Sequence, residues 1–189
     1  MNDTKVRSRI AWQGRTWRFR VLEYSLPDGS VKERGVINHP GSVLIVPMVE
    51  EKVLILRQYR IALESTILEL PAGTREPEEE WLTCAQRELR EETGYRAEEW
   101  TALGKVWPGP GITDELMAVF LARDLSPAPL PADDDEQIEV VSYGLNELVK
   151  MALGGELQDA KSVVGILRAA AFLGAYPAKM GEGRPSQAA

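Results

Sequence analysis

Residues 73–95, GTREPEEEWLTCAQRELREETGY, constrain this chain most, because they predict an amphipathic helix with acidic side chains gathered on one side. Pro77 and the three glutamates after it predict the helix start, since proline fits a first turn and acids favour the positive end of the helix dipole. Gly94 predicts the helix end. Three apolar residues recur at spacings of three and four, which predicts that their face is buried. They are Leu82, Ala85 and Leu89.

Three carboxylates lie along the border of this apolar face. Glu88 and Glu92 are four residues apart and therefore neighbours on a helix, with Glu91 beside them. Like charges at that spacing destabilise a helix by roughly 0.2–0.5 kcal/mol per pair. A divalent cation would remove the repulsion, and a set of hard oxygen donors without histidine or cysteine favours Mg²⁺ or Mn²⁺ over zinc. The alternative is a solvated acidic face with Arg87 and Arg90 as partners.

Length and composition narrow the class of protein. A chain of 189 residues with 44% hydrophobic content fits one domain with room for extensions. Apolar runs fall short of the roughly 18–20 residues of a membrane helix, and the N-terminus lacks the apolar stretch of a signal peptide. The single Cys84 excludes an internal disulfide and is expected to be buried. We therefore expect a cytoplasmic protein that does not bind membranes.

The charge of the chain is uneven. A net charge of −7 argues against broad binding to nucleic acid, which needs a basic surface. The first twenty residues are nevertheless basic. They are either a solvated strand or arm, or a segment that meets an anionic substrate or the acidic body of a second subunit.

The order of predicted elements indicates an α/β protein with a mixed sheet and helices on both faces. Pro27-Asp28-Gly29 predicts the turn of a hairpin between strands at 16–26 and 30–37. Residues 126–136 are rich in proline and acids, which excludes a regular element there, and residues from 176 onward predict a disordered tail. Further strands are predicted at 43–49, 53–58, 66–70, 100–106, 116–122 and 137–143, and helices at 145–153 and 159–173.

The acidic helix and the loop before it resemble the Nudix box, Gly-x5-Glu-x7-Arg-Glu-apolar-x-Glu-Glu-x-Gly-apolar. The resemblance implies an α/β/α sandwich, here with an N-terminal hairpin extension. It divides the chain into N-terminal strands at 1–40 that serve dimerisation or substrate contact, a hydrolase domain at 41–175 and a tail at 176–189. The defined positions are filled by Gly73, Glu79, Arg87, Glu88, Leu89, Glu91, Glu92, Gly94 and Tyr95.

The same resemblance implies roles for the box residues. Glu88 and Glu92 are expected to be the main ligands of Mg²⁺, with Mn²⁺ as the alternative, and Glu91 a third or alternate ligand. The backbone carbonyl of Ala72 is a further expected ligand. Arg87 is expected to pair with a box glutamate, Glu79 by preference, and to orient it.

Other segments resemble the ADP-ribose pyrophosphatase subgroup of the family. These are RQYR at 57–60, LELPAG at 68–73 and PGITDE at 110–115, in which Pro110 lies some fifteen residues past the box. For Arg57 and Arg60 the alternative is an ordinary strand end. For Glu69, which is expected to alternate out of the core, the alternative is an exposed side chain without a substrate contact. For Trp17 the alternative is packing in the core or at an interface. The expected substrate contacts are Arg57, Arg60, Glu69, Pro110, Glu115 and Trp17.

The catalytic base is expected to be a carboxylate or a metal-bound hydroxide. His39, the only histidine, precedes a proline and is expected to be an exposed loop residue. The subgroup takes its base from an acidic loop after the box, here residues 133–137, and Glu136 is favoured because it directly precedes a predicted strand.

The resulting expectation is a homodimeric enzyme that hydrolyses ADP-ribose to AMP and ribose 5-phosphate. The metals would neutralise the diphosphate and activate a water for in-line attack. The alternatives are a pyrophosphatase for GDP-mannose or another nucleotide sugar, a triphosphatase, which Pro110 disfavours, or a non-catalytic nucleotide-binding regulator, which tends to lose the box glutamates retained here.

Overall fold

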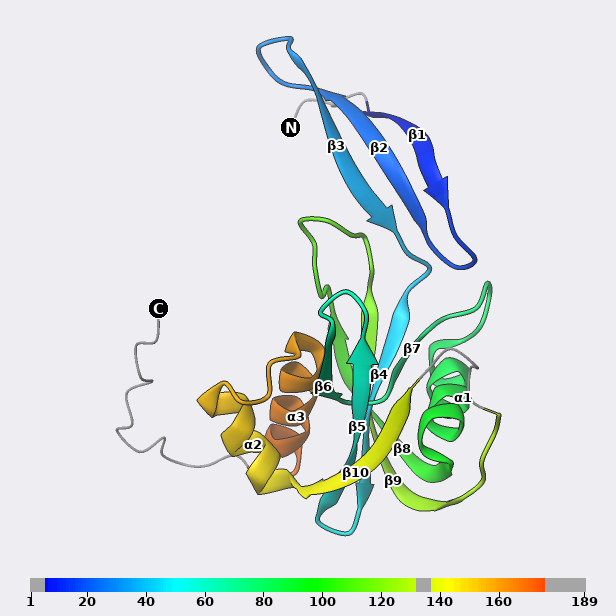
Figure 1. Cartoon of the computed structure of the whole chain (residues 1–189), viewed down its shortest axis with the longest axis vertical. Helices are drawn as coiled ribbons and strands as arrows, with labels where there is room; N and C mark the ends of the chain where they lie inside the picture. The colour runs from blue at the N-terminus through cyan, green and yellow to red at the C-terminus, as the bar shows by residue number, and fades with distance from the viewer. Residues whose placement is uncertain (1–5, 132–136, 176–189) are drawn as a thin grey trace.

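The computed structural model describes residues 6–131 and 137–175. At the N-terminus, three antiparallel strands form a separate sheet that projects from one end of the molecule (Figure 1). The strands are β1 (Val6–Gln13), β2 (Arg18–Ser25) and β3 (Val31–Asn38). The predicted hairpin is therefore present as β2 and β3, and the basic segment before it adds β1 as a third strand.

A larger mixed sheet forms the body of the molecule, with the strand order β10-β5-β4-β9-β8. In addition, β6 pairs with β5 and β7 pairs with β4. The pairing of β4 with β9 is parallel, and the other pairings in this sheet are antiparallel. The strands are β4 (Ser42–Val49), β5 (Lys52–Arg60), β6 (Ser65–Glu69), β7 (Ala72–Thr74), β8 (Tyr95–Val106), β9 (Met117–Pro127) and β10 (Ile138–Gly144).

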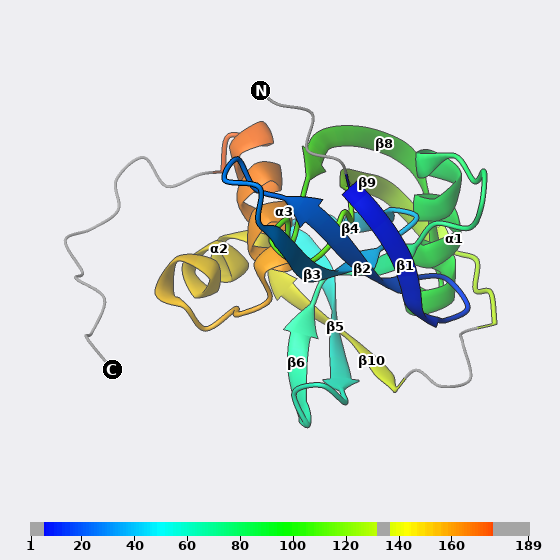
Figure 2. The ribbon, with the colours of Figure 1, turned by 90° about the horizontal axis from the view of Figure 1, so that it is seen from above.

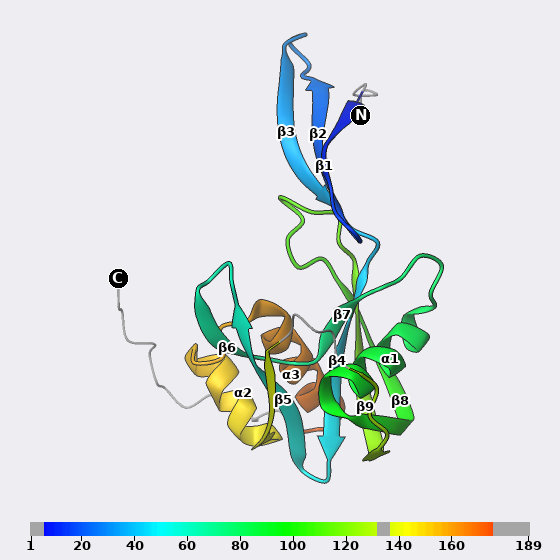
Figure 3. The same ribbon diagram turned by 45° about the vertical axis from the view of Figure 1, so that its right-hand side comes forward.

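Helices cover both faces of this sheet. The box helix α1 (Trp81–Thr93) lies on one face, and α2 (Leu145–Gly154) and α3 (Ala160–Phe172) lie on the other (Figures 2 and 3). This arrangement confirms the predicted α/β/α sandwich with an N-terminal extension. Among the described residues, the helices are too short or too polar to cross a membrane.

The central strand β4 is buried on both faces, which explains its nearly continuous apolar sequence. Val43 and Ile45 pack on the α1 side with Cys84, Ala85 and Leu89. The residues that alternate with them face the core on the α3 side. The core is therefore divided by the sheet into two layers, and α1 is held by the smaller one.

The box helix begins later than predicted. It starts at Trp81 with Glu80 at the N-cap, and Glu78 adopts a left-handed backbone with φ of 64°. The reason is that the segment before the helix folds into a turn in which the Glu79 side chain accepts a hydrogen bond from the Glu76 N–H at 3.0 Å. The predicted end at Gly94 is confirmed, with φ of 77°.

Two details of the predicted elements are wrong. Leu82 is 40% exposed, because the buried face of α1 runs through Cys84, Ala85 and Leu89, and in the first turn Trp81 rather than Leu82 packs against this cluster. Strand β8 starts immediately after the box helix and β9 continues to Pro127, so both are longer than the sequence indicated. They pair antiparallel along most of their length.

The N-terminal sheet is joined to the body by hydrogen bonds at residues 37–39. The Asp114 side chain accepts from the His39 N–H and from the Asn38 side-chain amide, each at 2.8 Å. The Ile37 N–H donates to the Ile112 carbonyl at 2.8 Å. These bonds attach β3 to the loop after β8, so the orientation of the N-terminal sheet depends on that loop.

We predict that Leu89→Ala lowers the free energy of unfolding by about 2–5 kcal/mol, because the residue is fully buried between α1 and the sheet. Leu82→Ala on the same helix is the matched control and should change it by less than about 1 kcal/mol. Urea denaturation with excess EDTA, at one protein concentration, measures both. Equal losses would contradict the assignment of the buried face.

Candidate active site

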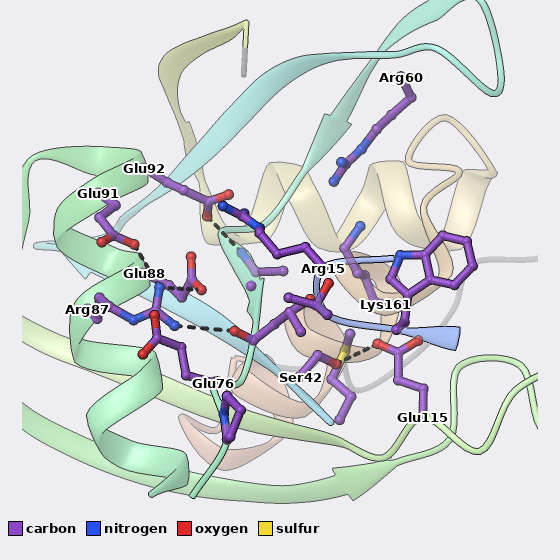
Figure 4. A pocket seen from close by; sticks show the side chains of 17 residues that line it. Arg15, Ser42, Arg60, Glu76, Arg87, Glu88, Glu91, Glu92, Glu115 and Lys161 are labelled. Atoms are coloured by element: carbon purple, nitrogen blue, oxygen red, sulfur yellow. Dashed lines mark hydrogen bonds and ion pairs between the residues drawn. The ribbon is translucent and has the colours of Figure 1, made fainter. Parts of the chain in front are cut away.

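A cleft of about 730 Å³ opens where α1, β7, the start of α3 and the β1–β2 turn meet (Figure 4). Carboxylates from α1 line one side, and cations from three separate segments line the rest. It is lined by Arg15, Thr16, Trp17, Ser42, Arg60, Ala72, Gly73, Thr74, Glu76, Pro77, Arg87, Glu88, Glu91, Glu92, Glu115, Met117 and Lys161.

The α1 side of the cleft is built by close packing of β7 against the helix. The Ala72 N–H donates to Glu92 Oε2 at 2.8 Å. A Cβ on Gly73 would lie 1.8 Å from the Glu88 carboxyl carbon, so only glycine allows this approach. Glu88 and Glu92 are 9% and 7% exposed, which is unusual for carboxylates. The structure therefore brings Ala72, Glu88, Glu91 and Glu92 together, as the sequence predicted.

Arg87 connects the carboxylates of the box to one another. Its guanidinium donates to both oxygens of Glu79 at 3.0 and 3.1 Å, to Glu88 at 2.7 Å and to Glu91 at 2.8 Å. A fourth contact reaches the Thr74 carbonyl at 3.2 Å. The expected pairing of Arg87 with Glu79 is present, and Arg87 additionally holds two residues on its own helix.

These contacts shift the acidities of both partners. Burial alone would raise the pKa of Glu79, but the hydrogen bonds from Arg87 and from the Glu76 N–H outweigh it, and the pKa is lowered. The hydrogen bond to Glu79, opposed by burial and supported by Glu88 and Glu91, raises the pKa of Arg87. Burial raises the pKa of the Cys84 thiol, which is thus an inert core residue at neutral pH.

Glu69 is buried, which corrects the prediction that it alternates out of the core. It is 1% exposed, and Arg60 donates to its two oxygens at 2.6 and 2.8 Å. Lys161, at the start of α3, contacts the same carboxylate. Burial opposes ionisation of Glu69, but these two cations prevail and lower its pKa. The first turn of α3 reaches this end of β6 through Lys161 and through Ser162, which accepts from the Leu70 N–H, and the alternation of a single strand does not reveal these contacts.

The N-terminal sheet contributes the third side of the cleft through its β1–β2 turn. Arg15 and Trp17 line the cleft, and the Trp17 ring lies 4.7 Å from that of Trp12. Below them, the Ser42 hydroxyl donates to Glu115 Oε1 at 2.6 Å. The predicted Trp17 and Glu115 are therefore at the cleft.

Three predicted site residues within the described part of the chain do not line the cleft, namely Arg57, Glu69 and Pro110. Arg57 lies outside it, because its side chain points to the exposed Glu139 on β10, 3.2 Å away. Pro110 is exposed and does not line it either. Glu136 lies outside the described residues, so its assignment as the base stays a prediction.

Sequence reasoning missed Arg15, Ser42 and Lys161 as individual cleft residues. The basic N-terminus was the only signal for Arg15, and it did not single out one of six cations. Lys161 lies far along the chain from the box and is placed by the packing of α3 beside β6.

The comparisons with known proteins agree with this site. The NUDIX domain family model matches residues 38–163. The chain belongs to the Nudix family and is a Nudix hydrolase. The ADP-ribose pyrophosphatase of Bacillus subtilis is 37% identical over 169 residues, covering 88% of this chain and 91% of that protein.

Two further similarities extend the comparison. The ADP compounds hydrolase NudE of Escherichia coli is 30% identical to this Nudix hydrolase, covering 85% of this chain and 84% of that protein. A crystal structure of an ADP compounds hydrolase superposes with a TM-score of 0.80 at 22% identity, covering 92% of this chain and 96% of that one. That structural likeness confirms the fold.

Nudix hydrolases generally use divalent metal ions, and the acidic side of the cleft fits such an ion. Within residues 6–131 and 137–175, no three His, Cys, Asp or Glu side chains are already arranged as a metal site. Glu88 and Glu91 each accept a hydrogen bond from Arg87, and Glu92 accepts one from the Ala72 N–H. The donors at hand are all hard oxygens, as Mg²⁺ or Mn²⁺ requires, and the missing side chain at Gly73 lets the Glu88 carboxylate lie against the β7 backbone.

We predict that Glu69 contributes pH-dependent stability. Its pKa is lower in the folded state than the ordinary value of about 4.5. As the pH falls, the unfolded chain therefore takes up its proton at Glu69 before the folded chain does. The contribution of Glu69 to the free energy of unfolding is complete above about pH 4.5 and is lost as the pH falls through the folded pKa.

The expected result is that Glu69→Gln is less stable than the wild type at pH 7 and that the difference shrinks below about pH 4.5. Urea denaturation from pH 7 to 3 measures it, with the exposed Glu139→Gln as the control. A difference between Glu69→Gln and wild type that does not change with pH would show that the Glu69 carboxylate is not the titrating group.

Proposed function

We propose that this Nudix hydrolase cleaves the diphosphate bond of a nucleoside diphosphate sugar, with ADP-ribose as the preferred substrate, giving AMP and ribose 5-phosphate. The observation that carries the proposal is a single cleft with the α1 carboxylates on one side and Arg15, Arg60, Lys161 and Trp17 on the others. A diphosphate needs cations beside its oxygens, and a nucleobase needs an aromatic or apolar surface.

The relatives support this choice of substrate. Those named ADP-ribose pyrophosphatase, from Bacillus subtilis and Mycobacterium tuberculosis, match over most of the chain at 37% and 31% identity. Relatives named GDP-mannose pyrophosphatase match at about 30% identity, over 66% of this chain in Salmonella arizonae and over 78% in Klebsiella pneumoniae. GDP-mannose is therefore the second candidate, supported by a shorter match.

The proposed metal is Mg²⁺, with Mn²⁺ as the alternative. Glu88 and Glu92 would be the main ligands, and Glu91 and the Ala72 carbonyl would be the remaining ligands from the protein. When bound, the ion would neutralise the diphosphate and lower the pKa of the attacking water. Arg87 has a positioning role, because it holds Glu88 and Glu91 in place without itself needing to touch substrate.

The remaining roles follow from position around the cleft. Arg60 binds a phosphate, fixed by its bidentate contact with Glu69. Trp17 packs against the base and Glu115 contacts the substrate from the floor of the cleft. Glu136 is the proposed general base that orients or deprotonates the water. Neither Arg57 nor Pro110 is given a substrate contact, since neither lines the cleft.

We predict that the wild type with Mg²⁺ converts ADP-ribose to AMP and ribose 5-phosphate faster than GDP-mannose, NADH, diadenosine polyphosphates or dNTPs. Glu92→Gln should lower kcat by about 100-fold or more, because an expected metal ligand is lost. Glu136→Gln should lower it by about 100- to 10,000-fold. Product chromatography measures all of them.

The control is Glu98→Gln, an exposed carboxylate on β8 outside the cleft, which should keep full activity. EDTA should abolish turnover and Mg²⁺ should restore it. Preferred cleavage of GDP-mannose would overturn the substrate assignment but not the metal site. Tight binding of a nucleotide without turnover would overturn the proposed activity.

We also propose a homodimer assembled through the N-terminal sheet, in the cytoplasm and without membrane or nucleic-acid partners. Trp12 pairs with Phe19 of β2, and Val31 pairs with Ser25 of β2. Ser25 lies six residues after Phe19, and this even separation places both on one face of the sheet. The apolar side chains of Trp12, Phe19 and Val31 therefore share that face. All three are exposed in the single chain. A second copy would cover that face, and the net charge of −7 disfavours a nucleic acid.

We predict that Phe19→Ser combined with Val31→Ser converts the dimer to monomer, because it removes apolar area from the proposed interface. Sedimentation equilibrium measures the mass. The control is Ile61→Ser, an exposed apolar residue after β5, which should leave the mass unchanged. A monomeric wild type, or a double variant that remains dimeric, would contradict this interface.

A further inference from the structure

Lys161 and Arg60 are fixed on one side of the cleft by a shared buried carboxylate. Lys161 lies in the first turn of α3, and its Nζ contacts Glu69 and, at 2.9 Å, Asp159 Oδ2. Glu69 also receives both hydrogen bonds from Arg60. Figure 4 shows Lys161 across the cleft from the labelled glutamates of α1. Both cations therefore face the space in which a diphosphate would lie.

The fold itself does not require this group of charges. Burying a carboxylate with its cations costs about as much desolvation free energy as their attraction returns, so apolar residues would serve stability as well. Asp159 already caps α3 by accepting from the Ser162 N–H at 3.1 Å. The Ser162 hydroxyl oxygen accepts from the Leu70 N–H at 2.7 Å, which ties the helix start to the end of β6. The helix start is thus anchored without the Lys161 ammonium.

The ammonium has capacity left for a ligand. A lysine has three N–H donors, and within the described part of the chain Lys161 has two partners, Glu69 and Asp159. Its side chain is 16% exposed and lines the cleft. Because its two partners hold the stem in one position, little rotamer entropy remains to be lost when an anion binds.

We propose that Lys161 is a phosphate-binding residue whose third N–H donates to a non-bridging oxygen of the substrate diphosphate, on the side of the cleft opposite the α1 carboxylates. This inference rests on the proposed function, since it assumes a diphosphate substrate. The substrate diphosphate would then be bound from two sides of the cleft, by the metal-binding side on α1 and by a cationic side built from β5, β6 and α3. Glu69 takes no part in substrate contact and serves to hold both cations.

The test is the affinity of Lys161→Met for two diphosphates that cannot be hydrolysed, measured by calorimetry with Mg²⁺. The probes are the α,β-methylene analogue of ADP-ribose and methylenediphosphonate. Loss of one charge-assisted hydrogen bond should weaken both about 10- to 100-fold. Lys161→Arg should keep most of the affinity, because it retains the charge and its donors.

The matched control is Lys150→Met, an exposed lysine on α2 away from the cleft, which should bind both probes as the wild type does. If Lys161→Met does not fold, Lys161→Gln is compared in its place. Unchanged affinity together with a lowered unfolding temperature would show that Lys161 only supports the Glu69 contacts, and would overturn the proposal. Failure of the wild type to cleave ADP-ribose would overturn the substrate assignment alone, because methylenediphosphonate reads phosphate binding independently.

Discussion

The contacts of the Arg87 guanidinium are the interaction on which the rest of the site depends. They join Glu79 and Thr74, in the segment before α1, to Glu88 and Glu91 on the helix. Without a cation at this point, several carboxylates would repel one another at the edge of a buried layer. The same contacts draw the segment into a turn, which explains why the helix starts only after it.

The sheet supplies the rigid frame for these contacts. Strand β4 is buried between α1 and α3, and it pairs with β7, whose glycine backbone lies against Glu88. A small movement of β7 or α1 would therefore displace the carboxylates directly. The opposite side of the cleft is held by α3 through the contact between Lys161 and Glu69. The helices on the two faces of the sheet thus place side chains of opposite charge in the same cleft, the carboxylates of α1 on one side and Lys161 of α3 on the other.

The local parts of the site were accessible from sequence because they follow from spacing along one helix. Glu88, Glu91 and Glu92 lie within one turn, and their common edge is a property of helix geometry. Residues placed by strand alternation were less predictable. Arg57 and Glu69 lie on neighbouring strands, yet Arg57 points outward to β10 while Glu69 is buried against Arg60 and Lys161. Which side of a strand is covered depends on elements far along the chain.

The sequence by itself determined the family, the acidic helix, the order of the elements and the likeness to a diphosphate hydrolase, because each of these depends on residues that are close together along the chain. Only the tertiary structure decided which cations reach the cleft. Lys161 meets Glu69 across 92 positions of sequence, and Arg15 arrives on the turn of a separate sheet. Such contacts depend on how the layers of the fold pack together. Packing brings together residues that are far apart in the sequence, and no periodic sequence pattern links them.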